Sequence, residues 1–261
     1  MKVTLIFFSF LLGVGSHSLR AETVNIAVAS NFAKPMQAIV SQFMHQTPHQ
    51  AKLSYASSGK IYAQIIHGAP FDIFLSADQA KPLALEQQQR IVNNTRQTYA
   101  IGRLALWSNY PQQQKIRAQS LSKSTLNKIA VANPDIAPYG AAAIEVLNHL
   151  KLYSTVKSRL IYGENIAQTF QFVSSRNADL GFISLSQVWY KGHLTHGSVW
   201  PIPTELHAPI KQDLVLLKRA KHNQAAQAML TFLQSEQAQQ IITDYGYLRV
   251  QQESNHHDAI N

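Results

Sequence analysis

Short apolar runs rich in β-branched residues alternate with helical patterns along nearly the whole chain. Eight runs read as strands: VNIAVAS, AKLSYAS, FDIFLSA, RLALWS, KIAVAN, RLIYGE, LGFISL and QDLVLLK. Helical patterns stand between them, among them residues 32–46, 139–152 and 165–176. Several strand runs are apolar on both faces, as in a parallel sheet that helices cover on both sides. The sequence therefore predicts an α/β fold.

The first 21 residues read as a secretory signal peptide. Lys2 precedes an apolar run at residues 3–15, and small and polar residues follow it. The run is shorter than the ~20 residues that a membrane-spanning helix needs. We expect export with cleavage near Ala21, a mature chain that begins at about Glu22, and a periplasmic location. The sequence contains no cysteine, so it offers neither a disulfide nor an acceptor for a lipid anchor.

The C-terminal part of the chain is expected to be helical. Residues 223–248 carry two consecutive helical patterns, with a break near Ser235–Glu236 and a stop signal at Gly246. Residues 251–261 form a polar tail. We interpret the His256–His257 pair in this tail as part of a frayed end and not as a metal site.

The chain is basic, with 23 Lys and Arg against 14 Asp and Glu and a formal charge of +9. Removal of Lys2 and Arg20 with the signal peptide leaves 23 − 2 = 21 basic residues and a charge of +7. The basic residues are scattered singly, and there is no basic helix or platform of alternating basic and aromatic residues. We interpret the charge as a solvated surface and expect no nucleic-acid partner.

Three predicted strand-to-helix junctions carry polar side chains. They are Ser30 with Asn31, Ser57 with Ser58, and Asn165 before Ile166. One such junction alone indicates only a helix cap. In an open α/β sheet, however, these junctions lie where ligands bind, and a helix start offers free N–H donors and a partial positive charge. Because ASNFAK and ASSGKI contain no acidic residue, we predict a small oxyanion as the ligand.

Sequence signals for catalysis or for a metal cation are weak. SSGK lacks the glycine five residues before Gly59 and the hydroxyl residue after Lys60 that a nucleotide-binding loop requires. There is no G-x-S-x-G nucleophile elbow. His193 and His196 lie in a glycine-bounded turn with no neighbouring carboxylate. We therefore predict no enzyme activity, no cofactor and no site for a free metal cation.

Six segments of the mature chain form a more specific pattern. They are AVASNFAKPMQAIVSQF, SYASSGKIYAQIIHGAPFDIFLSADQ, RQTYAIGRLALW, ANPDIAPYGAAAIEVL, ADLGFISLSQV and AQQIITDYGYLRV. In this order they resemble the periplasmic molybdate-binding proteins of molybdate transporters, over nearly all of the mature chain. ASSG followed by GAPFDIFLSAD is the most specific part.

The resemblance implies the fold of a type II periplasmic binding protein. In this fold two α/β lobes enclose a ligand cleft and are joined by two crossover strands. The first lobe would combine residues 22–100 with residues 208–250, and the second would hold residues 101–207. The crossovers would be YAIGRLALWS and APIKQDLVLLK.

The resemblance also implies a set of ligand-binding residues. The first lobe would contribute Ser30, Asn31 and Ser58, with Ser57 as a weaker candidate, and the second would contribute Tyr139 and the backbone at Ile166. Family members with alanine at the position of Tyr139 typically place a tyrosine where this chain has Ser184. This chain departs from that pattern, and we expect the hydroxyl to have moved to Tyr139. Ser184 is retained only as a weaker candidate.

These residues imply capture of a tetrahedral dianion by uncharged donors. The resemblance alone implies its delivery to the membrane permease of an ATP-binding-cassette importer. A site without a carboxylate disfavours a protonated anion such as phosphate. The choice among molybdate, tungstate, sulfate and chromate depends on cavity size, which the sequence does not give. A ferric-ion receptor of the same fold and an exported α/β hydrolase are the alternatives. We expect a monomer, as is usual for such receptors.

Overall fold

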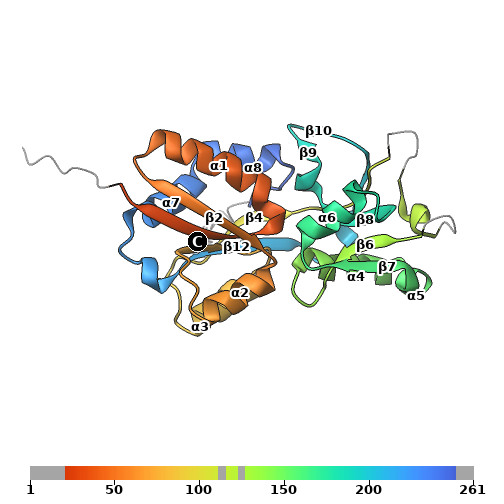
Figure 1. Ribbon diagram of the computed structural model, residues 1–261, viewed down its shortest axis with the longest axis horizontal. Coiled ribbons are helices and arrows are strands. Elements are labelled where there is room, and N and C mark those ends of the chain that lie inside the picture. Colours follow the sequence, from red (N-terminus) through yellow and green to blue (C-terminus); the bar gives the residue numbers. More distant parts are fainter. Residues whose placement is uncertain (1–20, 111–115, 123–126, 251–261) are drawn as a thin grey trace, which may run out of the picture.

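The computed structural model describes residues 21–110, 116–122 and 127–250, and in them two five-stranded sheets lie side by side (Figure 1). The predicted signal peptide, apart from Ala21, and the predicted tail lie outside the described residues. Among those residues, no helix combines the length and the apolar character that crossing a membrane requires. The predicted two-lobed α/β architecture is confirmed.

The first sheet has the strand order β2-β1-β3-β12-β4. Its strands are β1 (Thr23–Ala29), β2 (Gln50–Ala56), β3 (Ile73–Leu75), β4 (Gln97–Gly102) and β12 (Ile210–Leu216). β1 pairs in parallel with β2 and β3, whereas β12 is antiparallel to β3 and β4. The carboxyl ends of β1, β2 and β3 therefore meet at one edge of this sheet.

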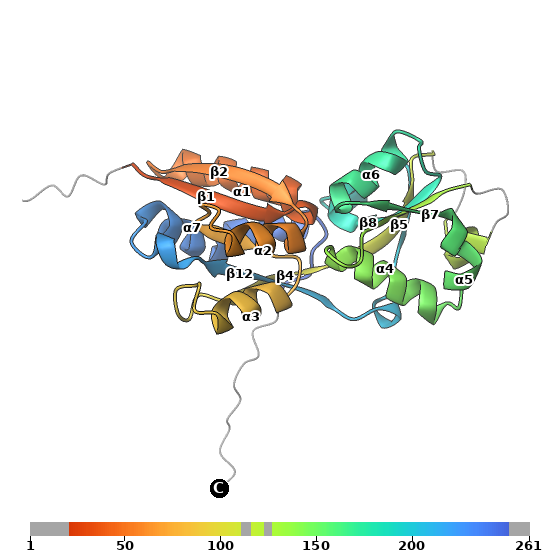
Figure 2. The ribbon, with the colours of Figure 1, turned by 60° about the horizontal axis from the view of Figure 1, so that its bottom comes forward.

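Helices cover both faces of the first sheet (Figure 2). They are α1 (Ala33–Gln46), α7 (Gln224–Gln234) and α8 (Glu236–Asp244) on one face, and α2 (Ser58–Ile66) and α3 (Ala80–Gln87) on the other. In β1, Ile26 and Val28 pack toward the first group, and Ala27 packs toward the second. This alternation explains why the strand is apolar on both sides.

The second sheet has the order β11-β5-β8-β6-β7. Its strands are β5 (Leu104–Ser108), β6 (Ile129–Ala132), β7 (Leu160–Gly163), β8 (Leu180–Ser184) and β11 (Ser198–Pro201). β6 is parallel to β7 and β8, so their carboxyl ends also share one edge. The helices of this lobe are α4 (Pro138–His149), α5 (Tyr153–Val156) and α6 (Ile166–Ser174). α4 and α5 pack on one face, and α6 packs on the other.

Two connections join the sheets. β4 continues through Arg103 into β5, and residues 202–209 lead from β11 to β12. A short hairpin of β9 (Trp189–Tyr190) and β10 (His193–Leu194) extends from the second lobe. Single 3₁₀ turns lie at Ser30–Phe32, Ala118–Ser122, Lys157–Arg159, Leu185–Gln187, Thr204–Leu206 and Lys218–Ala220.

Each of the eight predicted strand runs contains a strand, and the predicted break between two C-terminal helices falls at Ser235. β4 was expected only within the crossover YAIGRLALWS that the resemblance implies, and none of the eight runs covers β11 or the β9–β10 hairpin. β11 ends in Pro201, which only an edge strand or a strand end accommodates. The segment GHLTHG, interpreted as a turn, contributes β10, and its turn with β9 uses positive φ angles at Lys191 and Gly192.

Candidate functional site

A small pocket lies between the two lobes, where the carboxyl ends of the strands of both sheets face each other. The residues that line it are Ala29, Ser30, Asn31, Ser57, Ser58, Ala77, Ala137, Pro138, Tyr139 and Ile166. The centre of a water-sized sphere can move in about 10 Å³ of it, which is roughly the room for a single water molecule. The pocket therefore suits a ligand of a few atoms and not a sugar, peptide or nucleotide.

None of the ten residues that line this pocket carries a charged side chain. Six of the seven predicted ligand-binding residues are among them, and Ser184 is the exception. All seven are buried. The structure thus brings the predicted residues of both lobes to one place, although their role as ligands stays a prediction.

The first turn of α2 leaves one backbone N–H group for the pocket. The N–H groups at the start of a helix have no partner within the helix. Here Gly59 N donates to Ile136 O (3.0 Å) and Lys60 N to Ser57 Oγ (3.4 Å), and Ile61 N makes the first backbone bond of the helix, to Ser57 O (3.0 Å). None of these bonds uses the N–H of Ser58, which lines the pocket.

The first turn of α6 repeats this arrangement. Asn165 is the N-cap, and its Oδ1 accepts from Ala167 N (2.9 Å) and Gln168 N (3.1 Å). Its backbone oxygen accepts from Thr169 N (3.1 Å). These bonds leave the N–H of Ile166, so Asn165 acts as a cap while the next residue faces the pocket.

The first turn of α4 reaches the same result with a proline. Pro138 has no N–H, and Ala137 O accepts from Gly140 N (2.8 Å) and Ala141 N (3.2 Å). The N–H of Tyr139 is left. Three helix starts from two lobes therefore each present one unused N–H group, at Ser58, Tyr139 and Ile166, together with the positive ends of their dipoles.

Hydroxyl groups add further donors. Ser58 Oγ accepts from Ala77 N (2.9 Å), so its own proton remains available for donation. Ser57, the weaker candidate, lines the pocket but uses its Oγ as the N-cap of α2. Ser30 lies in the 3₁₀ turn directly after β1 and is buried in the pocket wall.

Tyr139 is placed to act as a proton donor. Its hydroxyl accepts from Gln212 Nε2 (3.1 Å), and only 1% of the residue is exposed. Burial raises the pKa of Tyr139 well above its usual value, and the neighbouring Tyr247 adds to this, while contacts with Ser184 and Gln212 oppose it. The phenol therefore stays protonated in neutral and mildly alkaline solution.

The side chain of Asn31 is held by other residues of the protein. Its side-chain Nδ2 donates to Gln212 Oε1 (2.9 Å) and to Tyr247 OH (3.0 Å), and both partners lie behind the pocket. Both amide hydrogens are thus engaged within the protein. In this structure the Asn31 side chain therefore holds the pocket wall, and the role of Asn31 as a ligand-binding residue stays a prediction.

Ser184 lies at the end of β8, beside Tyr139 and outside the pocket lining. Its Oγ is 2.8 Å from Ser186 Oγ, and its backbone N donates to Gln187 Oε1 (3.0 Å). Because the side chains of positions 139 and 184 contact each other, a hydroxyl from either position reaches the same region. The relocation of the hydroxyl to Tyr139 stays a prediction.

Three buried residues behind the pocket were not predicted from the sequence: Tyr99, Gln212 and Tyr247. Gln212 lies in a strand and Tyr247 after the last helix, far along the chain from the residues that they contact. The sequence carried no local signal for either.

The two lobes are in contact around the pocket. The Gly59–Ile136 backbone bond joins α2 to the segment before α4, and a Cβ on Gly59 would meet Ile136 Cα at 3.0 Å. On the other side, Lys34 Nζ donates to Gln187 O (2.6 Å). The structure is therefore a closed form in which the lobes touch on two sides of the pocket.

An ion pair at the rim also joins the lobes: Lys60 Nζ lies 2.6 Å from Glu164 Oε1, and both side chains are about half exposed (50% and 46%). Exposed pairs contribute roughly 0–1 kcal/mol. We expect Lys60→Met to weaken ligand binding by less than about fivefold, measured by titration calorimetry at low salt. A larger loss would show that the pair determines closure.

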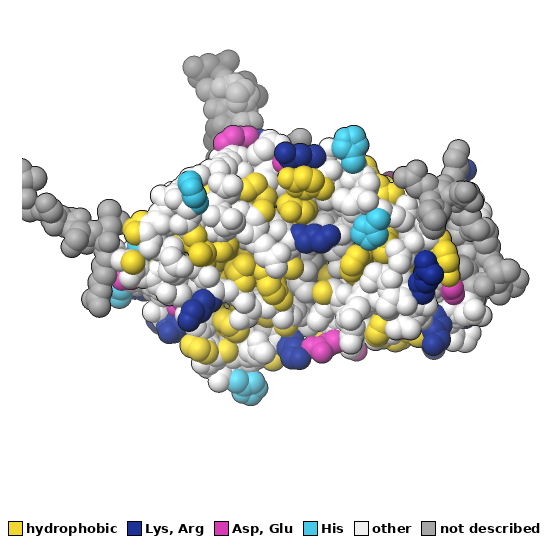
Figure 3. Space-filling model, turned by 45° about the horizontal axis from the view of Figure 1, so that its top comes forward, with side chains coloured by type: hydrophobic (Ala, Val, Ile, Leu, Met, Phe, Trp, Pro, Cys, Tyr) yellow, Lys and Arg dark blue, Asp and Glu magenta, His cyan; other side chains and the backbone are white. Residues whose placement is uncertain are grey.

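No group of three or more His, Cys, Asp or Glu side chains that could hold a metal ion occurs among the described residues. His196 packs edge-on against Trp107, with ring centroids 5.1 Å apart, and His193 is exposed on the hairpin. On the face shown in Figure 3, Lys and Arg side chains stand apart and do not form one continuous patch.

Two lobes that close over a small polar pocket define a solute-binding protein. The family of bacterial extracellular solute-binding proteins matches residues 24–248, and the chain belongs to this family.

The relatives of the chain include solute-binding proteins for one particular anion, molybdate. The chain is 44% identical to the molybdate-binding protein ModA of Azotobacter vinelandii, over 90% of this chain and 94% of that one. It is 40% identical to ModA of Rhodobacter capsulatus, over 92% and 93%. The solved structure of the periplasmic molybdate-binding protein of A. vinelandii superposes with a TM-score of 0.84 and 34% identity, over 87% of this chain and all of that one.

Proposed function

We propose that the protein is a periplasmic receptor that captures molybdate, with tungstate as a second ligand, and delivers it as a monomer to the membrane permease of an ATP-binding-cassette importer. The names of its relatives support the ligand and the location. Residues 22–100 with residues 208–250 form one lobe in this proposal, and residues 101–207 form the other.

The observation that carries the proposal is the convergence of three helix starts on a pocket without charged side chains. The N–H groups of Ser58, Tyr139 and Ile166 and the hydroxyls of Ser30, Ser58 and Tyr139 can all donate to one anion. Backbone N–H groups and helix dipoles stabilise negative charge without a salt bridge. In the closed form the low dielectric strengthens each of these bonds.

The same donors explain why the pocket would prefer an anion without a proton to a protonated anion. A dianion such as molybdate accepts at every oxygen, whereas hydrogen phosphate must also place a proton. The pocket lining offers no carboxylate to receive that proton. Burying an unsatisfied hydroxyl costs about 1–3 kcal/mol, so phosphate is disfavoured by roughly 5- to 150-fold. Sulfate carries no proton at neutral pH and is distinguished from molybdate by its smaller size.

The alternatives fit the pocket less well. A ferric-ion receptor would need phenolate or carboxylate ligands, and burial raises the pKa of Tyr139 well above its usual value. A hydrolase would need a base beside its nucleophile, but no histidine or carboxylate lines the pocket around Ser58.

Calorimetry and thermal unfolding of the mature protein with molybdate, tungstate, sulfate, phosphate and ferric citrate test the proposal. A ligand at 100 times its dissociation constant stabilises the folded state by about 2.7 kcal/mol. We expect this with molybdate and tungstate, and a much smaller effect with the other three at equal concentration. The absence of any response to molybdate and tungstate would refute the proposal.

Replacing Ser58 by alanine removes a hydroxyl donor from the pocket. A hydrogen bond to a charged group contributes about 1.5–3 kcal/mol, so we expect molybdate to bind roughly 10- to 150-fold more weakly. Ser41→Ala, on the exposed side of α1, is the matched control and should bind as the wild type does. Equal affinities of Ser58→Ala and Ser41→Ala would remove Ser58 from the site.

A further inference from the structure

A buried hydrogen-bond network behind the pocket joins the crossover strand β12 to both lobes. At its centre is Gln212, which is fully buried. Its side chain contacts Asn31 and Tyr99 of the first lobe and Tyr139 of the second. The functional site described above does not require Gln212 as a ligand, since this residue does not line the pocket.

The orientation of the Gln212 amide is fixed by its partners. Oε1 accepts from Asn31 Nδ2 (2.9 Å) and lies 2.9 Å from Tyr99 OH. Rotation of the amide by 180° would bring its NH₂ group against the NH₂ group of Asn31, two donors with no acceptor between them. Nε2 therefore faces the hydroxyl of Tyr139, at 3.1 Å.

This orientation decides what the Tyr139 hydroxyl can do. Because it accepts a hydrogen from Gln212, its own proton is directed elsewhere. Its other side-chain neighbours are Ser184 and Tyr247. Ser186 Oγ donates to Asn31 O (2.8 Å), so the proton between Ser184 Oγ and Ser186 Oγ (2.8 Å) comes from Ser184, and Tyr247 OH donates to Asn31 O (2.8 Å). Both neighbours therefore offer Tyr139 only an acceptor oxygen, and its hydroxyl donates to one of them or to a ligand in the pocket.

A backbone irregularity in β12 accompanies the contact between Gln212 and Tyr139. The pairing of β12 with β4 shifts register between Gln212 and Asp213, so that Gln212 faces Ala100 and Asp213 faces Thr98. Tyr99 is the extra residue of this β-bulge, and its hydroxyl reaches Gln212. β-Bulges commonly redirect a side chain beside a functional site.

We propose that Gln212 is a positioning residue that holds the Tyr139 hydroxyl as a hydrogen-bond donor and thereby selects an oxyanion without a proton. This inference rests on the proposed function, because it assumes that Tyr139 contacts the anion. Gln212 acts through Tyr139, so its contribution must disappear when the hydroxyl of Tyr139 is absent.

A double-mutant cycle with sodium molybdate as the ligand tests this dependence. Gln212→Met keeps the length of the side chain and removes its donor, and Tyr139→Phe removes the hydroxyl. We expect Gln212→Met to weaken binding about 10-fold in the wild-type background and less than about twofold in the Tyr139→Phe background. Equal losses in the two backgrounds would show that Gln212 does not act through Tyr139.

If Gln212→Met does not fold, a milder variant still tests the inference. Tyr99→Phe removes a hydroxyl whose single proton is shared between Gln212 Oε1 (2.9 Å) and Ser76 O (3.0 Å). Tyr62→Phe removes an exposed hydroxyl, which accepts from Gln88 Nε2, as a matched control. We expect Tyr99→Phe to weaken molybdate binding about threefold, again only when the Tyr139 hydroxyl is present. Wild-type affinity in Tyr99→Phe together with additivity in the cycle would overturn the inference.

The outcomes separate this inference from the proposed function. If the wild-type protein binds neither molybdate nor tungstate, the proposed function fails and this inference fails with it. If the wild-type protein binds molybdate and the cycle is additive, the proposed function stands and only the role of Gln212 is refuted. Melting temperatures of all variants without ligand show whether each change in affinity is independent of folding.

Discussion

Replacing Gly102 by alanine is expected to weaken molybdate binding by roughly 10- to 150-fold, the equivalent of one lost hydrogen bond to a charged group. A Cβ at this position would lie 2.2 Å from Tyr139 OH and 2.4 Å from Gln212 Nε2. The φ angle of Gly102 lies outside the left-handed region, so the backbone itself tolerates alanine. The conflict is therefore with the donor hydroxyl and with the amide that orients it.

The measurement for Gly102→Ala is titration calorimetry with molybdate, accompanied by thermal unfolding without ligand. Overpacking of this kind costs about 1–3 kcal/mol of stability. Introducing Tyr139→Phe removes the closest atom in the conflict but leaves Gln212 Nε2 at 2.4 Å from the added Cβ. We therefore expect Gly102→Ala to weaken binding less in the Tyr139→Phe background than in the wild-type background. If the free-energy losses of binding from Gly102→Ala and Tyr139→Phe add in the double variant, the steric conflict at Gly102 does not involve the Tyr139 hydroxyl.

Much of the binding pocket follows from local sequence signals. The junctions at Ser30–Asn31, at Ser57–Ser58 and before Ile166 were identified because a helix start after a strand needs polar caps and lies at a known edge of the sheet. Asn165 shows how a cap and a donor cooperate: the side chain satisfies two N–H groups, and the next residue keeps its own. Such patterns extend over only a few residues, so a single sequence reveals them.

The interior of the site could not be predicted in the same way. Gln212 contacts Asn31 across 181 positions of the chain and Tyr139 across 73, and only the course of β12 between the lobes brings them together. In the sequence, Gln212 is one polar residue at the start of an apolar run. The hydrogen bond between Asn31 and Tyr247 could not be predicted either, because the two residues are 216 positions apart in the chain.

In the proposed site a basic protein would hold an anion without using its basic residues. Lys34, in the first turn of α1, donates to Gln187 O and joins the lobes, and burial lowers its pKa. Lys60 pairs with Glu164 at the rim. Binding by N–H and hydroxyl groups avoids desolvation of a cation inside the pocket, which is a large cost for a small site.

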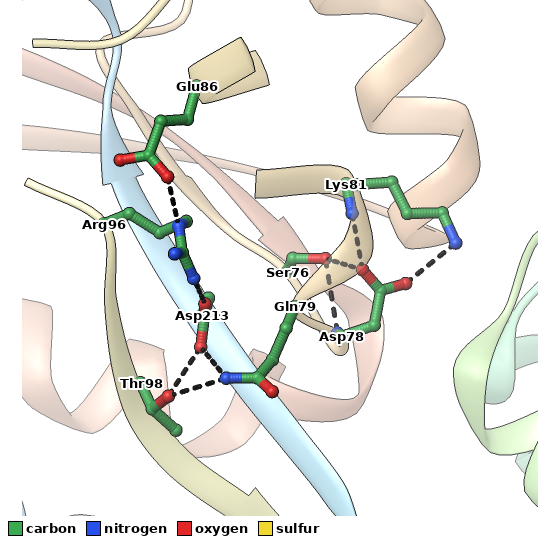
Figure 4. A network of polar contacts seen from close by, with 8 residues as sticks. All are labelled: Ser76, Asp78, Gln79, Lys81, Glu86, Arg96, Thr98 and Asp213. Atoms are coloured by element: carbon green, nitrogen blue, oxygen red, sulfur yellow. Dashed lines mark hydrogen bonds and ion pairs between the residues drawn. The ribbon is translucent and has the colours of Figure 1, made fainter. Parts of the chain in front are cut away.

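Replacing Arg96 by methionine is expected to cost about 2–3 kcal/mol of folding stability, somewhat less than the 3–5 kcal/mol for a fully buried pair. Asp213 is fully buried beside Gln212 and accepts from Arg96 Nη1 (2.9 Å), Thr98 Oγ1 (2.7 Å) and Gln79 Nε2 (3.0 Å) (Figure 4). Arg96→Met would leave this carboxylate with neutral donors only. The estimate is reduced because the Arg96 side chain is 30% exposed.

Thermal unfolding measures this loss, and for a chain of this size we expect the melting temperature to fall by about 5–10 °C. Arg249→Met is the matched control, because it removes an exposed pair with Glu236 and should change the melting temperature by no more than about 3 °C. Since Asp213 directly follows Gln212 in the β-bulge, Arg96→Met should also loosen the Tyr139 contact and weaken molybdate binding a few-fold. Equal melting temperatures of the two arginine variants would mean that Asp213 does not depend on Arg96 for its burial.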